Sequence, residues 1–420
     1  MRHSVLFALP AILSRLTPEH RRRLALDVIL PLSQDEESTV RSAVLEALGE
    51  VMYTFKDDEE GPPEPLLKLF LGIRETEDPG GDNQREQSPS PPPVARPQLP
   101  RSAPSVAPTS SAFSDYGTDA GGGPDIYEDP QRPLVCAFNY PAVTLTLGRQ
   151  RWPELRPLYL ALVQDPSFKV RRTLAASLGE MAKIIGEEHA RADLMDVFWS
   201  SLHAEESEVR MKVLDALQTF VRALGHPERS EVAKGLEEAF SSGKLTSWRE
   251  REAAVKALGG LVEVEGIDPE VLKRMLIKAL DDRVAAVREA ALAVVSGPYS
   301  ELYRRHRADN VPQVPTFVKT WRETPSLLEA LRAEVRAFAT SSTFRQRTTY
   351  VTCIQEMLVS DQGDVVVGEG TFWDALSALV RDPIVDVRIR VARLLALISG
   401  ELLTRRSIIC SSSSPCVVIH

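Results

Sequence analysis

Residues 165–185 read DPSFKVRRTLAASLGEMAKII, and most of the chain repeats the pattern of this stretch. Apolar residues stand three, four, seven and ten positions after Arg171, which places them on one face of a helix with about 3.6 residues per turn. Asp165 lies six positions before this arginine, and Val170 lies directly before it. The stretch therefore predicts a turn with an acidic residue, followed by a helix with one apolar stripe.

Eight arginines stand at the start of such stretches, and neighbouring ones are about forty residues apart unless a longer segment intervenes. A second helical stretch precedes most of them and often begins with proline, which suits the first helical position because no donor is needed there. Paired helices at this period are typical of HEAT repeats, whose apolar faces are buried only by stacking. We therefore expect an all-α protein, an α-solenoid of about eight HEAT repeats. The anchor arginines are Arg2, Arg41, Arg171, Arg210, Arg251, Arg288, Arg347 and Arg388.

Four of the anchors have an aspartate six positions earlier, in the turn between the two helices: Asp35, Asp165, Asp282 and Asp382. A carboxylate in this turn can cap the free N–H groups of the second helix. It can also pair with the arginine of a stacked neighbour, so we expect a ladder of ion pairs that fixes the register of the repeats. The repeats of Arg210, Arg251 and Arg347 lack the aspartate, and their ladder contacts are expected to differ.

Residues 76–131 interrupt the repeats with a stretch rich in proline, serine and glycine and poor in leucine, isoleucine and valine. Such a segment buries too little apolar surface to offset its backbone entropy, so we expect it to be disordered. We accordingly expect N-terminal repeats over 1–75, the first of them incomplete, a C-terminal array over 132–402 and an unstructured tail over 403–420. Residues 304–325 are expected to form a long loop within the C-terminal array.

The composition excludes several classes of protein. A formal net charge of -9 argues against a nucleic-acid-binding surface, and no apolar run is long enough to span a bilayer. The four cysteines form no CxxC pair, and no motif for a nucleophile, a phosphate-binding loop or a metal is present. We therefore expect no enzymatic activity, no cofactor or metal, and no nucleic-acid, membrane or small-molecule partner. Reduced thiols are consistent with a cytoplasmic or nuclear location.

Residues 136–152, CAFNYPAVTLTLGRQRW, and the following stretch through Leu174 resemble the regulatory subunit 1 family of protein phosphatase 4. The resemblance continues more weakly through the later anchors, and that family also has a low-complexity insert. It implies a non-catalytic scaffold subunit that binds a serine/threonine phosphatase catalytic subunit and recruits protein substrates. The alternative is an adaptor of the karyopherin type that cradles protein cargo, because the fold alone does not separate the two.

A recurring pair of residues marks a candidate partner-binding ridge along the inter-helix turns. Two positions before the anchor, Lys169, Arg249 and Arg345 each follow an aromatic residue, and arginine and tryptophan often dominate binding energy at interfaces. The aromatics can instead pack between repeats, which is the competing interpretation. If this ridge is not the binding site, Arg149 and Trp152 are the next candidates. The full set is Arg149, Trp152, Lys169, Trp248, Arg249, Phe344 and Arg345, with Phe168 beside Lys169.

The predicted insert can be tested by limited proteolysis of the full chain. We expect the first cleavages within residues 76–131, because an extended segment enters a protease active site more readily than a packed helix does. Mass spectrometry of the early fragments gives the sites. Early cleavage within residues 153–300 would contradict the assignment of the repeats.

Overall fold

The computed structural model describes residues 2–73, 126, 129–296, 317–321, 324–359, 368 and 370–412. The predicted disordered insert therefore lies outside the described residues, except for residues 126 and 129–131. The described chain divides into two compact units, residues 1–132 and 133–420, and each is treated by itself.

The first unit is built around one apolar helix. Helix α3 packs against α1, α2 and α4, and its residues Val44, Leu48 and Val51 are almost wholly buried. Leu6 and Ile29 from α1 and α2 are likewise buried, so the stripe predicted after Arg41 is the core of this unit. The helices are α1 (Arg2–Leu13), α2 (Pro18–Ser33), α3 (Ser38–Tyr53) and α4 (Glu64–Leu71).

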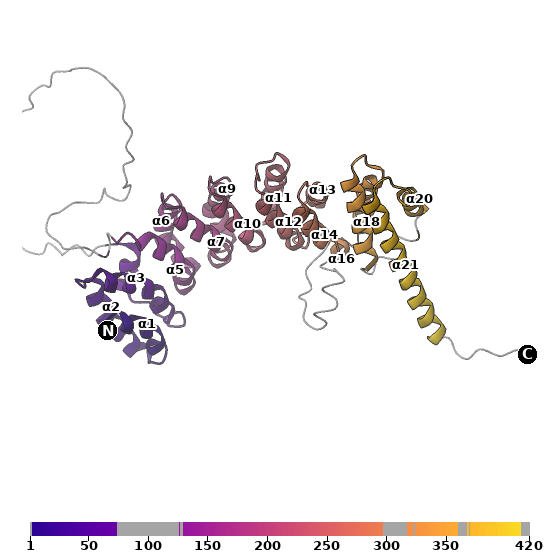
Figure 1. The fold of residues 1–420 in the computed structure, drawn as a ribbon. Helices are drawn as coiled ribbons and strands as arrows, with labels where there is room; N and C mark the ends of the chain where they lie inside the picture. Colours follow the sequence, from indigo (N-terminus) through magenta and orange to yellow (C-terminus); the bar gives the residue numbers. More distant parts are fainter. Residues whose placement is uncertain are drawn as a thin grey trace, which may run out of the picture. The chain divides into compact units, whose positions relative to one another are not determined.

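The second unit is a succession of helix pairs (Figure 1). It runs in the order α5 (Arg132–Leu147), η2 (Arg149–Arg151), α6 (Trp152–Val163), α7 (Phe168–Ile185), α8 (Glu187–His189), η3 (Ala190–Leu194), α9 (Met195–Leu202), α10 (Ser207–Arg222), α11 (His226–Ser241), α12 (Trp248–Leu261), α13 (Pro269–Leu280), α14 (Ala285–Ser296), α16 (Phe317–Thr320), α17 (Pro325–Ala337), η5 (Phe338–Thr340), α18 (Phe344–Val359), α20 (Gly370–Leu379) and α21 (Val385–Ser412).

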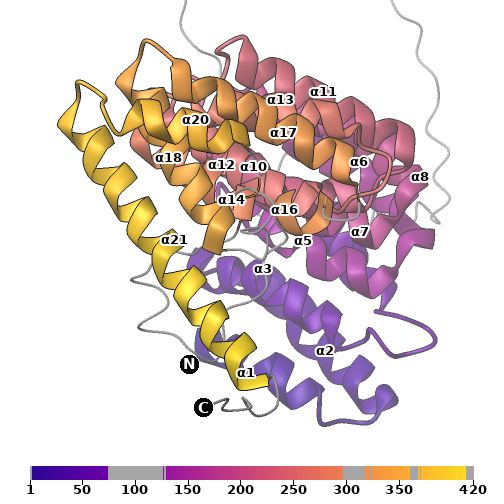
Figure 2. The ribbon, with the colours of Figure 1, turned by 90° about the vertical axis from the view of Figure 1, so that its right-hand side faces the viewer.

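The pairs of the second unit form two layers of helices. Figure 2 looks along the succession of pairs, with α20 and α21 nearest the viewer. The second helices of successive pairs pack on one another in the order α7, α10, α12, α14, α18 and α21. In the other layer α11 packs on α13, and α13 on α17. This stacking of helix pairs is the α-solenoid of HEAT repeats expected from the sequence.

Close approach between α7 and α10 depends on one glycine. A Cβ added at Gly179 would lie 2.9 Å from the carbonyl oxygen of Ala216 and 3.1 Å from the amide nitrogen of Phe220. Both neighbours are helix backbone, which cannot move aside cheaply. The glycine therefore lets the two helices pack at short distance, and any side chain at this position would separate them.

Seven of the eight anchor arginines, all except Arg2, hold the turn of their own repeat. The Nη1 group of Arg171 donates hydrogen bonds to the carbonyl oxygens of Asp165 and Pro166, at 2.6 and 3.0 Å. Arg347 does the same with Ser341 and Ser342, at 2.8 and 3.1 Å. These carbonyls lie between two helices and have no partner in either of them, so the guanidinium satisfies acceptors that the helices leave open. Equivalent bonds are made by Arg41, Arg210, Arg251, Arg288 and Arg388.

The same arginines also reach the next repeat and form a ladder of ion pairs. Arg251 donates to Asp282 at 2.6 Å and Arg347 donates to Asp382 at 2.5 Å, both with the aspartate that follows in the next turn. In the first unit Arg2 donates to Asp35 at 2.6 Å. These pairs join neighbouring repeats at one fixed register because each arginine is already held by its own turn.

Glutamates replace the aspartate where the turn lacks one. Arg171 donates to Glu206 at 2.6 Å, and Arg210 donates to Glu250 at 2.8 Å. Glu250 is fully buried and also accepts from the hydroxyl of Ser207 at 2.7 Å. The ladder therefore requires a carboxylate next to the guanidinium of the preceding anchor, and this carboxylate can come from different sequence positions.

The turn aspartates do not cap the helices directly, which differs from the expectation. Oδ1 of Asp165 accepts from the backbone N–H of Ser167 at 2.8 Å, and Ser167 is the residue before α7. Asp282 and Asp382 make the same contact two residues ahead, at 2.8 Å in each case. The carboxylate is too close in sequence to reach the first helical N–H groups, so it closes the turn instead.

The structure also changes two expectations about segments. Helix α21 continues to Ser412, so residues 403–412 of the predicted tail are helical; no proline stands between Pro383 and Pro415 to interrupt it. Within the predicted loop of residues 304–325, α16 begins with the buried Phe317, and Trp321 directly after α16 is also buried.

We expect Asp382→Asn to lower the free energy of unfolding by about 3 kcal/mol at pH 7, because it leaves the buried guanidinium of Arg347 without its counter-charge. The hydrogen bond from Arg347 lowers the pKa of Asp382. A lowered pKa stabilises the fold above the ordinary carboxyl range near pH 4, and this stabilisation is lost as the pH falls through the folded-state value. The difference between wild type and variant should therefore shrink on acidification.

Urea denaturation at pH 7 and pH 3 measures both quantities. Asp386→Asn is the matched control, since the Asp386 pair with Arg390 is exposed and contributes little. A destabilisation by Asp382→Asn that is equally large at both pH values would contradict the assignment.

Candidate functional site

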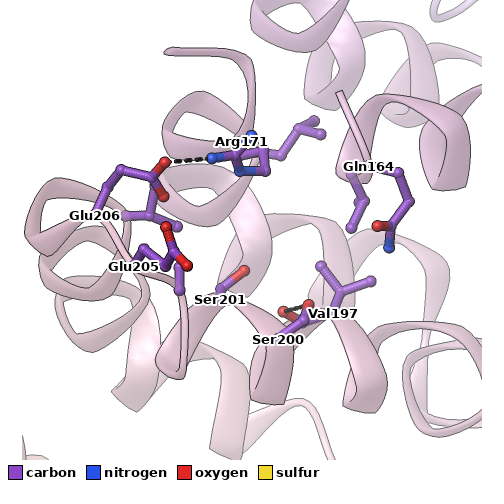
Figure 3. A pocket seen from close by; sticks show the side chains of 11 residues that line it. Gln164, Arg171, Val197, Ser200, Ser201, Glu205 and Glu206 are labelled. Atoms are coloured by element: carbon purple, nitrogen blue, oxygen red, sulfur yellow. Dashed lines mark hydrogen bonds and ion pairs between the residues drawn. The ribbon is translucent and has the colours of Figure 1, made fainter. Parts of the chain in front are cut away.

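A pocket opens between two stacked repeats at the edge where the inter-helix turns lie (Figure 3). We call it the inter-repeat pocket; its volume is about 240 Å³. Its floor is aliphatic and its rim is polar, and α6, α7, α9 and α10 all contribute. The lining residues are Val163, Gln164, Arg171, Leu174, Val197, Ser200, Ser201, Ala204, Glu205, Glu206 and Val209.

The rim of the inter-repeat pocket contains a rung of the ladder. Figure 3 shows the guanidinium of Arg171 pointing at the carboxylate of Glu206, at 2.6 Å. This hydrogen bond lowers the pKa of Glu206 and keeps it ionised. Glu205 lies exposed beside it, so the rim holds two carboxylates against one cation. Hydrogen-bond acceptors over an aliphatic floor suit a lysine or arginine side chain of a partner protein.

The inter-repeat pocket is lined by aliphatic, hydroxyl, amide and carboxylate side chains and one guanidinium. Its lining contains no histidine, cysteine or lysine that could act as a base or activate a nucleophile. Ser200 donates its hydroxyl to the carbonyl of Val197 at 3.0 Å, a helix-internal contact that activates nothing.

A second hollow, the Trp248 groove, lies between α10 and α12 and measures about 390 Å³. The side chain of Trp248 is half-buried at one end, and the guanidinium of Arg249 lies 4.5 Å from the centre of its ring. This distance is typical of a cation–π contact. The other lining residues are Met211, Leu214, Asp215, Gln218, Glu252, Ala253, Lys256 and Ala257.

The charges of the Trp248 groove leave one cation without an ion pair. Lys256 pairs with Glu252 at 2.7 Å, and Asp215 pairs with Lys212 at 3.0 Å. Arg249 is exposed and has no ion pair within the part of the chain that the structure describes. The groove thus offers an aromatic ring, an apolar floor and one available positive charge.

The ladder holds the Trp248 groove in shape. Ser247 precedes α12 and accepts from the backbone N–H of Arg249, while the carboxylate of Glu250 accepts from the N–H of Ser247, which is a capping box. The same Glu250 carboxylate receives the guanidinium of Arg210 from the preceding repeat. One buried carboxylate therefore fixes both the start of α12 and the neighbouring helix, and with them the position of Trp248.

The predicted ridge residues do not converge on one site. Lys169 is exposed on α7 beside a half-buried Phe168, and neither lines the inter-repeat pocket or the Trp248 groove. Phe344 is 53% exposed, while Arg345 donates to Asp281 of the preceding turn at 3.3 Å. Only Trp248 and Arg249 lie together in a groove.

The reserve candidates lie in different environments. Arg149 is exposed in η2, after Gly148, whose φ of 72° begins the turn. Trp152 is fully buried, which contradicts its role as a surface candidate. Its indole N–H donates to Asp193 at 2.8 Å, and its ring packs edge-on against Tyr159 at 5.5 Å. A large aromatic at the start of α6 is buried there because the π-helical turn η3 places an acceptor opposite its N–H.

Sequence reasoning missed the half of the Trp248 groove that α10 provides. Met211, Asp215 and Gln218 stand at helical spacing on the surface of α10, but no offset from the anchor distinguishes them from other surface positions. These residues line a groove only because α10 packs against α12.

Other reactive groups are inert or absent from the described ranges. Burial raises the pKa of the Cys353 thiol to about 12, which keeps it protonated. Across residues 2–73, 129–296 and the later described segments, no group of histidine, cysteine, aspartate or glutamate has the arrangement of a metal site. None of the described helices is both long and apolar enough to cross a bilayer.

The fold defines a helical-repeat protein of the α-solenoid class. Residues 136–239 match the family described as protein phosphatase 4 regulatory subunit 1 middle domain, and residues 25–55 match the HEAT repeat. These matches confirm the resemblance carried by residues 136–174 and the class of repeat.

Relatives with curated names point the same way. The serine/threonine-protein phosphatase 4 regulatory subunit 1 of Homo sapiens is 35% identical over 170 residues, and that of Mus musculus has the same identity. The match covers 40% of this chain and 18% of each relative, so the chain spans less than a fifth of their length.

Among solved structures, one of Kap95p bound to RanGDP is similar over 91% of this chain and 42% of that chain. The sequence identity is 13% and the TM-score is 0.41. A likeness of this size carries no argument about function.

We expect Trp152→Ala to lower the free energy of unfolding by about 3–5 kcal/mol, since it empties a buried aromatic site and removes the indole donor from Oδ2 of Asp193, which keeps only the bond from Arg156 to its Oδ1. Trp248→Ala should have a much smaller effect because Trp248 is half-buried. Chemical denaturation followed by circular dichroism compares the two. Similar losses for both variants would contradict the distinction between a core tryptophan and a surface one.

Proposed function

We propose that this chain is a non-catalytic regulatory or scaffold subunit that binds the catalytic subunit of a type 4 serine/threonine protein phosphatase and helps to recruit its protein substrates. The observation that carries the proposal is the match of residues 136–239 to the middle domain of the regulatory subunit. This segment includes every residue of the inter-repeat pocket and the α10 wall of the Trp248 groove.

The chemistry of the two hollows supports a protein partner. The inter-repeat pocket offers carboxylates over an aliphatic floor, and the Trp248 groove offers an aromatic ring with an unpaired guanidinium. Tryptophan and arginine in such grooves often contribute most of the binding energy at protein interfaces. In this proposal the catalytic metal ions belong to the partner, and this chain needs no cofactor. We infer a cytoplasmic or nuclear location, where such phosphatases act on intracellular proteins.

Capture of a purified type 4 catalytic subunit by the purified full chain tests the proposal. We expect a stable complex on size-exclusion chromatography and no phosphatase activity from the chain alone. The double variant Lys169→Glu, Arg249→Glu should weaken capture at least tenfold, if these exposed cations each contribute about 1 kcal/mol. Arg345 is left unchanged because its reversal would also break the contact with Asp281.

A matched control carries the same charge change elsewhere. Lys183→Glu with Arg381→Glu reverses two exposed cations outside both hollows, and it should bind as wild type does. Failure of the wild-type chain to bind the catalytic subunit would reject the proposal. Specific binding of a small GTPase or import cargo instead would favour the karyopherin-like alternative.

A further inference from the structure

The Trp248 groove lacks an ion pair that bridges the preceding gap between second helices. In that gap Arg172, the residue after the anchor of α7, pairs at 2.5 Å with Glu208, which lies two positions before the anchor of α10. The corresponding residues of α10 and α12 are Met211 and Arg249, which cannot form an ion pair with each other. Both of them line the groove. The hollow between α10 and α12 therefore has a thioether on one wall and a guanidinium on the other.

The charges of this groove favour an incoming anion. Each carboxylate that lines the groove already has a lysine partner: Glu252 pairs with Lys256 at 2.7 Å, and Asp215 pairs with Lys212 at 3.0 Å. Arg249 is exposed and makes no ion pair within the described ranges. A guanidinium that lies over an aromatic ring can still donate its N–H groups to a carboxylate. The groove therefore offers one cation whose charge is not balanced by the residues around it.

The shape of the groove suits a short extended segment. Its floor is apolar: Leu214 is buried, and the half-buried Ala253 and Ala257 leave space because their side chains are small. Trp248 and Ala257 are nine positions apart, which is about 14 Å along α12 and about the length of four extended residues. The flexible side chain of Met211 can adjust to different apolar groups.

We propose that the Trp248 groove binds an extended segment of a partner protein in which an apolar side chain lies next to an aspartate or glutamate. The apolar side chain packs on Ala253 beside the indole ring, and the carboxylate pairs with Arg249. The proposal deepens the proposed function, on which it rests in taking the recruited partner to be a protein, because it names the chemistry of the segment that is bound.

A basic segment does not fit these charges. Its cation would meet Arg249, while the carboxylates of Asp215 and Glu252 are already neutralised by lysines. Placing like charges together in a groove is unfavourable and weakens association. The expected partner segment is therefore acidic and apolar.

Selection from random peptides tests this chemistry on the full chain. Peptides of about twelve residues, long enough to span the groove at ~3.3 Å per residue, are displayed on phage and selected on the immobilised chain. The Trp248→Ala chain serves for counter-selection, so that peptides bound elsewhere are removed. We expect the enriched peptides to share an apolar residue beside aspartate or glutamate. Enrichment of basic peptides, or the absence of any enrichment that depends on Trp248, would overturn the proposal.

Charge exchange with the most enriched peptide identifies the contact. Arg249→Gln should raise the dissociation constant about tenfold, because it removes a charge-assisted hydrogen bond. Arg249→Glu should weaken binding further, and replacing the acidic residue of the peptide by lysine should restore binding to this variant. Arg381→Gln is the matched control, an exposed arginine outside the groove, and it should leave the affinity unchanged. An affinity that Arg249→Gln leaves unchanged would overturn the proposal.

These measurements use the chain without a catalytic subunit, so the two proposals fail separately. A chain that captures the catalytic subunit but selects no acidic and apolar peptide would contradict the peptide-binding role of the Trp248 groove alone. A chain that selects such peptides through Trp248 and Arg249 supports this role even if the catalytic subunit does not bind, in which case only the proposed function is rejected.

Discussion

The rest of the structure depends on the hydrogen bonds that one arginine makes near the start of the second helix of a repeat. One edge of the guanidinium closes its own turn through two carbonyl oxygens, and at Arg171, Arg210, Arg251 and Arg347 the other edge also holds a carboxylate of the next repeat. Because the arginine is immobilised before it meets the carboxylate, the ion pair loses little side-chain entropy. Apolar stripes drive stacking in general, but this contact selects a single register.

The ladder also connects the fold to the candidate binding surfaces. Glu250 takes part in the capping box of α12 and in the rung with Arg210, so the same carboxylate that joins two repeats positions Trp248 and Arg249. The rung of Arg171 with Glu206 likewise forms the rim of the inter-repeat pocket. The shapes of the two hollows therefore depend on the ion pairs that join neighbouring repeats. The hollows differ because these ion pairs use different residues.

Variation in the ladder is as informative as its regularity. Between the repeats of Arg288 and Arg347 the direction reverses, and Arg345 donates back to Asp281. Burial and the neighbouring Arg345 lower the pKa of Arg288, which reflects two guanidinium groups near one another. At Arg388 the ladder stops with its apolar surroundings exposed. These two places depart from the pattern of the other rungs.

The sequence by itself determined the repeat unit, its anchors and the pairs that use the aspartate six positions earlier, because a 3.6-residue period and a short turn are local properties. It also carried the resemblance of residues 136–174. Tertiary structure alone decided that Glu206 and Glu250 replace the aspartate, that Trp152 is buried against Asp193, and that α10 completes the Trp248 groove. Each of these joins residues about forty positions apart or pairs a turn with a neighbouring helix, and which side chains meet across a stack depends on inter-repeat distances that no local pattern encodes.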